Sequence, residues 1–214
     1  MKYAMTFLGI LFSAGLLFSC GNSPKEEKGE EKGALEKISE SVGAVKNLNK
    51  MADYAKDLES RIEELKALSP VSNDVLKAVL PETLQGLKRT SLNVGDMSAL
   101  NMASAKGQYK TEDGTKSVDI DILDGAGEGA GGMVSLVFLG LSADREQIDE
   151  NGFEKTTEID GQRALVKERT SGDTKDSEIQ TIHDERFVVT VKGNGYSLEE
   201  LTDVFKNFDL SPLK

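Results

Sequence analysis

Residues 153–169, FEKTTEIDGQRALVKER, decide the fold class of this chain. At their centre lies Asp160-Gly161, a two-residue pair that is among the strongest sequence signals for a β-hairpin turn. We therefore predict antiparallel strands at 153–159 and 162–169.

Working outward from this hairpin, two more strand pairs are predicted around short polar turns. They are 103–109 with 116–123, around 112–114, and 177–183 with 186–192, around 184–185. Within 116–123, Val118, Ile120 and Ile122 alternate with Asp119 and Asp121, which indicates one buried and one solvated face.

Helical patterns interrupt and close this run of strands. A short helix is predicted at 73–80, before Pro81, and an apolar helix at 132–143, which grades into the polar residues 142–147. Ser197 and Glu200 form a capping-box pattern that opens a last helix through Asn207. The predicted domain, 70–214, is therefore α+β, an antiparallel sheet covered by helices.

Residues 34–69 are predicted to form one long amphipathic helix. Apolar residues recur at spacings of three and four, with a break in phase near Leu48, and Ser69-Pro70 ends the pattern. At 1.5 Å per residue the helix would span roughly 50 Å. It could pack on the domain, pair with itself as a coiled coil or stand as a stalk, and we favour packing or weak self-association.

The first 19 residues have the pattern of a bacterial export signal. Lys2 precedes an apolar run of roughly a dozen residues, short of the ~20 needed to span a bilayer. The run ends in LFSC, residues 17–20, which resembles the lipobox of bacterial lipoproteins. The resemblance implies cleavage before Cys20 and acylation of that cysteine, whose acyl chains (palmitate among them) would hold the protein on a membrane. A plain secretory signal is the alternative interpretation.

Residues 20–33 lack apolar residues to bury after the cysteine and are predicted to be a disordered, acidic tether. The Lys-Glu-Glu at 25–27 is similar to the surface-export signal of Bacteroidota lipoproteins, although a solvated spacer would look the same. Without residues 1–19 the chain has 25 Lys and Arg against 37 Asp and Glu, a net formal charge of −12. Such a charge repels phosphate backbones, so we expect no nucleic-acid partner.

Three further segments of the domain stand out. They are LPETLQGLKRT at 80–90, GFEK at 152–155 with Gly161 and Ala164-Leu165, and RFVVTVKG at 186–193 with Phe208-Asp209-Leu210. All three resemble parts of uncharacterised envelope lipoproteins of Bacteroidota type. The match covers about residues 78–214. The order of strands and helices is also similar to the PsbP/Mog1-like sandwich. The resemblance implies an antiparallel sheet covered by helices and an outer-membrane location, with no catalytic residue.

Residues 127–132, GEGAGG, match the literal G-x-G-x-x-G of dinucleotide-binding sites. Such a site needs a parallel βαβ unit, whereas the strands here are predicted to be antiparallel. Glu128 would also place a negative charge near the phosphates. We therefore interpret the segment as a flexible turn and expect no cofactor.

The carboxylates Asp119, Asp121 and Asp124 are weak candidates for a calcium site, because Ca²⁺ takes closely spaced oxygen ligands. Asp173, Asp176 and Glu178 form a comparable set, and neither set has EF-hand spacing.

His183, the single histidine, is interpreted as a turn residue, and zinc is not expected. The aromatic residues are interpreted as core; they are Tyr109, Phe138, Phe153, Phe187, Tyr196, Phe205 and Phe208.

The sequence thus predicts a non-enzymatic envelope lipoprotein that binds a protein partner or a small apolar ligand. The ligand hypothesis requires an apolar cavity beneath residues 132–143. One alternative is a hydrolytic enzyme with two carboxyl groups of raised pKa in a cleft. Another is an assembly protein that self-associates through residues 34–69.

Overall fold

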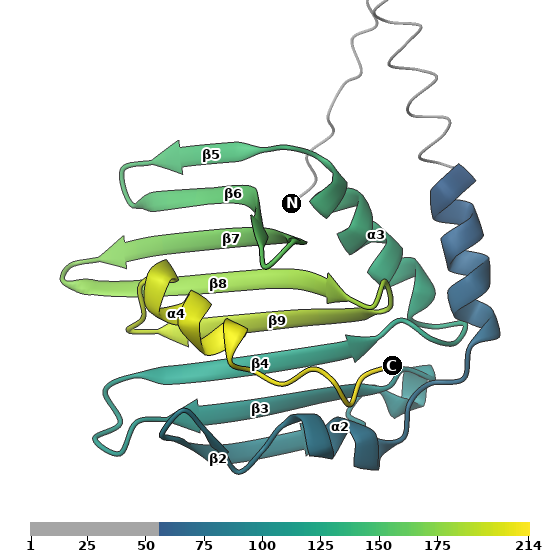
Figure 1. The fold of residues 1–214 in the computed structure, drawn as a ribbon, viewed down its shortest axis with the longest axis horizontal. Helices are drawn as coiled ribbons and strands as arrows, with labels where there is room; N and C mark the ends of the chain where they lie inside the picture. Colours follow the sequence, from purple (N-terminus) through teal and green to yellow (C-terminus); the bar gives the residue numbers. More distant parts are fainter. Residues whose placement is uncertain (1–55) are drawn as a thin grey trace, which may run out of the picture. The chain divides into compact units, whose positions relative to one another are not determined.

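The computed structural model describes residues 56–214 (Figure 1). The predictions for the signal peptide at 1–19, for Cys20 and the tether at 20–33, and for the first part of the long helix lie outside the described residues.

The domain is built on one nine-stranded sheet in which every neighbouring pair is antiparallel, in the order β1-β2-β3-β4-β9-β8-β7-β6-β5. The antiparallel α+β class is therefore confirmed. The strands are β1 (Thr83–Leu84), β2 (Leu87–Val94), β3 (Ser104–Lys110), β4 (Ser117–Asp124), β5 (Glu146–Asp149), β6 (Gly152–Ile159), β7 (Gln162–Ser171), β8 (Thr174–His183) and β9 (Phe187–Asn194).

The hairpin at 153–169 is present as predicted. Ile159 pairs with Gln162, and Asp160 and Gly161 have φ values of 50° and 79°. Both are in the left-handed region that the tightest hairpin turns require. Asp184 and Glu185 likewise connect β8 to β9 with φ values of 49° and 52°.

The helices follow the predicted caps. The short helix α2 (Asn73–Val79) is capped by the side chain of Ser72, and α4 (Leu198–Lys206) opens with the complete capping box of Ser197 and Glu200. Helix α3 (Gly131–Ser142) ends where Ala143 becomes extended, at φ −87° and ψ 133°. The polar residues after it do not prolong the helix but form the edge strand β5.

Strands β1, β2 and β5 were not predicted. The register of β2 against β3 shifts between Arg89 and Ser91, and such an irregularity breaks the two-residue alternation that identifies a strand. All four residues of β5 are exposed, so no buried side of the strand shows in its sequence.

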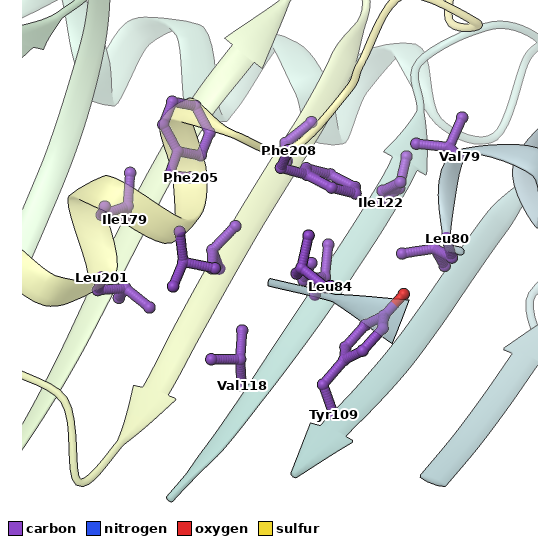
Figure 2. Close-up of a cluster of buried hydrophobic side chains, with 14 of the residues drawn as sticks. Val79, Leu80, Leu84, Tyr109, Val118, Ile122, Ile179, Leu201, Phe205 and Phe208 are labelled. Carbon is purple, nitrogen blue, oxygen red and sulfur yellow. The ribbon is translucent and has the colours of Figure 1, made fainter. Parts of the chain in front are cut away.

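The sheet packs against α2 and α4 on one face, which we call the core face. Alternate residues of the central strands point to this face, and Leu201 and Phe205 of α4 and Leu76 of α2 cover them (Figure 2 shows part of this cluster). Val118, Ile120 and Ile122 are at most 1% exposed, so the alternation read from β4 is confirmed.

The opposite face, which we call the α3 face, carries a smaller cluster. Leu123, Ile182 and Val188 point to it and meet Val134 of α3 and Leu65. Leu65 belongs to the helix at 56–67, whose half-buried and buried residues recur at Leu58, Arg61, Ile62 and Leu65. Within the described residues, the predicted long helix therefore packs on the domain.

Within residues 56–214, no helix combines the length and the apolar character that crossing a membrane requires.

Candidate functional site

A groove of about 400 Å³ lies beside α3 on the α3 face of the sheet. Met133 and Val137 of α3 form one wall, and Asp96 and Met97, in the loop after β2, form another. The floor comes from β2, β3, β4, β8 and β9 and consists of Asn93, Ser104, Lys106, Asp121, Leu123, Gln180, Val188 and Thr190, with Ala105 and Ile122 also in contact with the space. A volume of this size is within the range of small-molecule sites, ~300–1,000 Å³. The ligand hypothesis required an apolar cavity beneath residues 132–143. This groove is instead open and lies beside α3, whereas Val134, beneath the helix, packs against Leu65 and Val188.

The strand register divides the floor into two rows. Near α3, Leu123 and Val188 lie side by side on β4 and β9. Two residues farther along the strands, roughly 7 Å away, lies a polar row in which Asn93, Lys106, Asp121, Thr190 and Gln180 are successive cross-strand neighbours. The groove therefore has an apolar end under the helix and a polar end on the open sheet.

The polar row is tied together by its own contacts. Lys106 Nζ lies 3.4 Å from Asp121 Oδ1 and 3.9 Å from Asp119 Oδ2. Gln180 Nε2 donates a hydrogen bond of 3.2 Å to Thr190 Oγ1. The single lysine of the groove is thus already shared between two carboxylates.

A second hollow, of about 220 Å³, flanks the other side of α3 and is lined by Phe138, Leu141, Ser142, Gln162, Arg163, Ile182 and Glu185. The guanidinium carbon of Arg61 stands 4.2 Å from the centre of the Phe138 ring, and Arg163 Nε donates to the carbonyl oxygen of Leu141 at 3.0 Å.

The prediction that Phe138 is a core residue is wrong, because this residue is only half-buried, whereas Tyr109, Phe187, Tyr196, Phe205 and Phe208 are buried. Phe153 is partly buried against the core.

Helix α3 exposes apolar residues on its outer side. Met133, Leu136 and Leu139 are 47%, 67% and 45% exposed. A helix that is apolar all round is normally buried, and α3 is covered only on the side that faces the sheet and helix 56–67.

The three candidate calcium ligands do not converge. Asp119 and Asp121 share Lys106 on the α3 face, whereas Asp124 lies on the core face and is fully buried. In the second set, Asp176 accepts a hydrogen bond from the backbone N–H of Gly195 and Glu178 lies 3.9 Å from Lys192. Among residues 56–214, no group of three or more His, Cys, Asp or Glu side chains is arranged to hold a metal ion.

Asp124 is the residue whose role the sequence interpretation missed. Its Oδ1 accepts hydrogen bonds from Arg186 Nε at 2.7 Å and from the N–H of Ala126 at 2.9 Å. Its Oδ2 accepts from Arg186 Nη2 and from the N–H of Val71, both at 2.8 Å. This bidentate pair raises the pKa of Arg186 and fixes the segment between helix 56–67 and α2 to the end of the sheet. Its position in phase with Val118, Ile120 and Ile122 was the available signal that it is buried.

The glycines of 127–132 serve the packing of the chain. Gly127 has a φ of +89°, and a Cβ atom on Gly129 would lie 2.4 Å from the carbonyl oxygen of Leu100. The strands before and after α3, β4 and β5, lie within a fully antiparallel sheet, so the parallel βαβ unit of a dinucleotide site does not form here.

His183 is the last residue of β8, next to the predicted turn. Its Nε2 lies 3.3 Å from the carbonyl oxygen of Leu213, and its Nδ1 is buried without a hydrogen-bond partner among the described residues.

Where the pKa of an Asp or Glu among the described residues departs from its ordinary value, it is lowered, as for Asp149 beside Arg169 and for Glu200 beside Lys116. The hydrolase alternative predicts the opposite direction, two carboxyl groups of raised pKa in a cleft.

Comparison of the chain with protein-family models, curated proteins and solved structures found no match.

Proposed function

We propose that this protein is a lipid-anchored envelope protein that binds a small, largely apolar ligand in the groove beside α3, without catalysing a reaction on it. The observation that carries the proposal is the groove itself, with its apolar wall of Met133 and Val137 above Leu123 and Val188. The groove borders residues 132–143, the segment near which the sequence predicts a ligand site, and its end next to that helix is apolar.

The rest of the sequence interpretation belongs to the same proposal. Cys20 would carry the acyl chains, residues 20–33 would form the tether, and residues 34–69 would continue the helix whose described part is 56–67. A kinship with Bacteroidota envelope lipoproteins and with the PsbP/Mog1-like sandwich is likewise proposed, on the residue patterns quoted above. An outer-membrane location follows from that kinship.

Binding is tested on the mature chain from residue 20 with Cys20→Ser, which lacks the acyl chains. We expect saturable binding of the neutral fluorescent probe N-phenylnaphthylamine, and we expect Val137→Phe to weaken it by on the order of tenfold because the added ring fills part of the groove. Leu139→Phe is the matched control, since Leu139 lies on the same helix but outside the groove lining. Equal probe affinity in both variants, each with an unchanged circular dichroism spectrum, would contradict the proposal.

The anchor is tested separately. Full-length protein should fractionate with membranes and incorporate labelled palmitate, and Cys20→Ala should lose the label and retain the leader. Incorporation of label by the Cys20→Ala protein would refute acylation at this residue.

Self-association through residues 34–69 remains a second proposal. Within 56–67 the apolar side of the helix faces its own domain, which leaves residues 34–55 to mediate it. Sedimentation equilibrium of the same Cys20→Ser chain decides this point, because a monomer at high concentration rules the proposal out.

A further inference from the structure

The charges around the groove indicate which end group its ligand carries. The lining contains Asp96, Asp121 and Lys106, so the carboxylates outnumber the cation. Asp119 lies just outside the lining and is the second carboxylate within 4 Å of Lys106. The positive charge of Lys106 is therefore balanced within the protein, and the groove lining together with Asp119 has a net negative charge.

The register fixes where a polar end group would lie. The apolar row of Leu123 and Val188 is under α3, and the row that contains Lys106 and Asp121 is one side-chain repeat farther along the same strands. A ligand with an alkyl body beneath Met133 and Val137 would therefore place its other end at the row of Lys106 and Asp121. Asp96, exposed in the loop after β2, adds a second carboxylate to the groove wall. The N–H of Gly95 bonds to the carbonyl oxygen of Ser104, so Asp96 follows the row of Leu123 and Val188 and not the row of Lys106.

We propose that the groove selects amphiphiles that carry a positively charged amine, with the alkyl chain against α3 and the ammonium group at Asp121. This inference rests on the proposed function, since it assigns the ligand class of the same groove. An ammonium group adds a cation to a site that has an excess of carboxylates. A carboxylate in the same place would have to take Lys106 from Asp119 and Asp121.

The side-chain exposures set the size of the effect. Lys106 is 40% exposed, and Asp121 and Asp119 are 38% and 23% exposed, so solvent and salt screen these charges in part. Selectivity between amine and carboxylate should accordingly be on the order of tenfold at low salt and should shrink as salt is added.

The experiment uses three ligands with the same ten-carbon chain. Decylamine, decanol and decanoate, each below its micelle concentration, compete with N-phenylnaphthylamine for the mature Cys20→Ser chain at neutral pH. We expect decylamine to compete best and decanoate worst, by about tenfold overall. Asp121→Asn combined with Asp96→Asn should remove most of the advantage of decylamine. Glu178→Gln, which removes a carboxylate from the same sheet face outside the groove, should leave it unchanged.

The outcomes separate the two proposals. If none of the three compounds displaces the probe, and the probe itself does not bind saturably, the proposed function fails. If all three compete equally, or if decanoate competes best, the groove binds amphiphiles but the amine selectivity is refuted. Equal effects of Glu178→Gln and of the double variant would refute it as well, because the selectivity would then come from net charge.

Discussion

The two faces of the sheet differ in how they are closed. On the core face, which α2 and α4 cover, a continuous set of apolar side chains runs from β1 to β6 in sheet order. On the α3 face, α3 and helix 56–67 cover only the small cluster around Leu123, Val188 and Ile182. The same strands therefore present a sealed interior on one side and a partly open surface on the other.

The open part of the α3 face is a row of alternating charges. Across β4, β9, β8, β7 and β6 the successive cross-strand neighbours are Asp119, Lys192, Glu178, Lys167 and Glu154. Lys192 lies 3.9 Å from Glu178, and Lys167 lies 3.4 Å from Glu154. Each cation has an anion on both sides, an arrangement that stabilises a sheet face without burying it. The groove lies at the boundary between this charged row and the apolar cluster.

The largest difference in stability is expected between substitutions at two aspartates of β4, which lie on opposite faces of the sheet. Asp124→Ala leaves the guanidinium of Arg186 without its partner at a site that is mostly buried, and we expect a loss of about 3–5 kcal/mol in the free energy of unfolding. Asp119→Ala, on the other face, removes one partially exposed ion pair and should cost under ~1 kcal/mol. Urea denaturation of the Cys20→Ser chain measures both. Equal losses would mean that the two faces do not differ as described.

The next largest difference in stability is expected between substitutions in α4, on the core face, and in α3, on the α3 face. Leu201 of α4 is fully buried, whereas Leu136 of α3 is 67% exposed. We expect Leu201→Ala to lower the free energy of unfolding by about 2–5 kcal/mol through the cavity that it leaves, and Leu136→Ala to change it by at most ~0.5 kcal/mol. A loss of several kcal/mol in Leu136→Ala would show that its side chain is covered in solution.

Sequence reasoning succeeded where a local rule decides the structure. Asp160-Gly161 predicts its hairpin because the turn needs two residues that tolerate positive φ, and Ser197 with Glu200 predicts the start of α4 because the cap is formed within four residues. Alternation in β4 placed Asp119 and Asp121 on the solvated face for the same local reason.

Reasoning from sequence failed where the partner lies far along the chain. Asp124 and Arg186 are 62 residues apart, so their pairing depends on β4 lying next to β9. The groove likewise depends on packing between distant parts of the chain. Its walls come from α3 and from the loop after β2, which β3 and β4 separate in the sequence. Its apolar wall could be predicted from residues 132–143, and Asp121 on the solvated face from the alternation of β4, but the meeting of the two with the loop of Asp96 could not.

A smaller effect is expected at the capping box of α4. Ser197→Ala should cost about 1 kcal/mol, because the N–H of Glu200 loses its acceptor. The pH dependence has a definite sign. The hydrogen bond from Lys116, and then that from the N–H of Ser197, lower the pKa of Glu200, so its contribution is present above the pKa of an unfolded Glu and is lost as the pH falls through the lowered folded value.

Urea denaturation at pH 7 and at stepwise lower pH tests this sign. The stability lost between neutral and acidic pH should be smaller in Glu200→Gln than in the parent chain, since the glutamine has no such charge to lose. Glu199→Gln, one residue earlier and outside the capping box, is the matched control. An acid-induced loss as large in Glu200→Gln as in the parent would contradict the assignment.

The smallest predicted effect tests the charged row itself. Lys192→Gln removes the cation between Asp119 and Glu178, leaves two carboxylates without it, and should cost roughly 0.2–1 kcal/mol at low salt. Lys110→Gln is the matched contrast, because Lys110 lies on the same face between Lys88 and Ser117 and has no anion directly opposite on either strand. Its replacement should be neutral or slightly stabilising. Both differences should fade near 1 M salt, where the screening length falls to ~3 Å. An equal cost for the two lysines would mean that the alternation of charges contributes nothing, and the open half of the face would then be only a solvated surface.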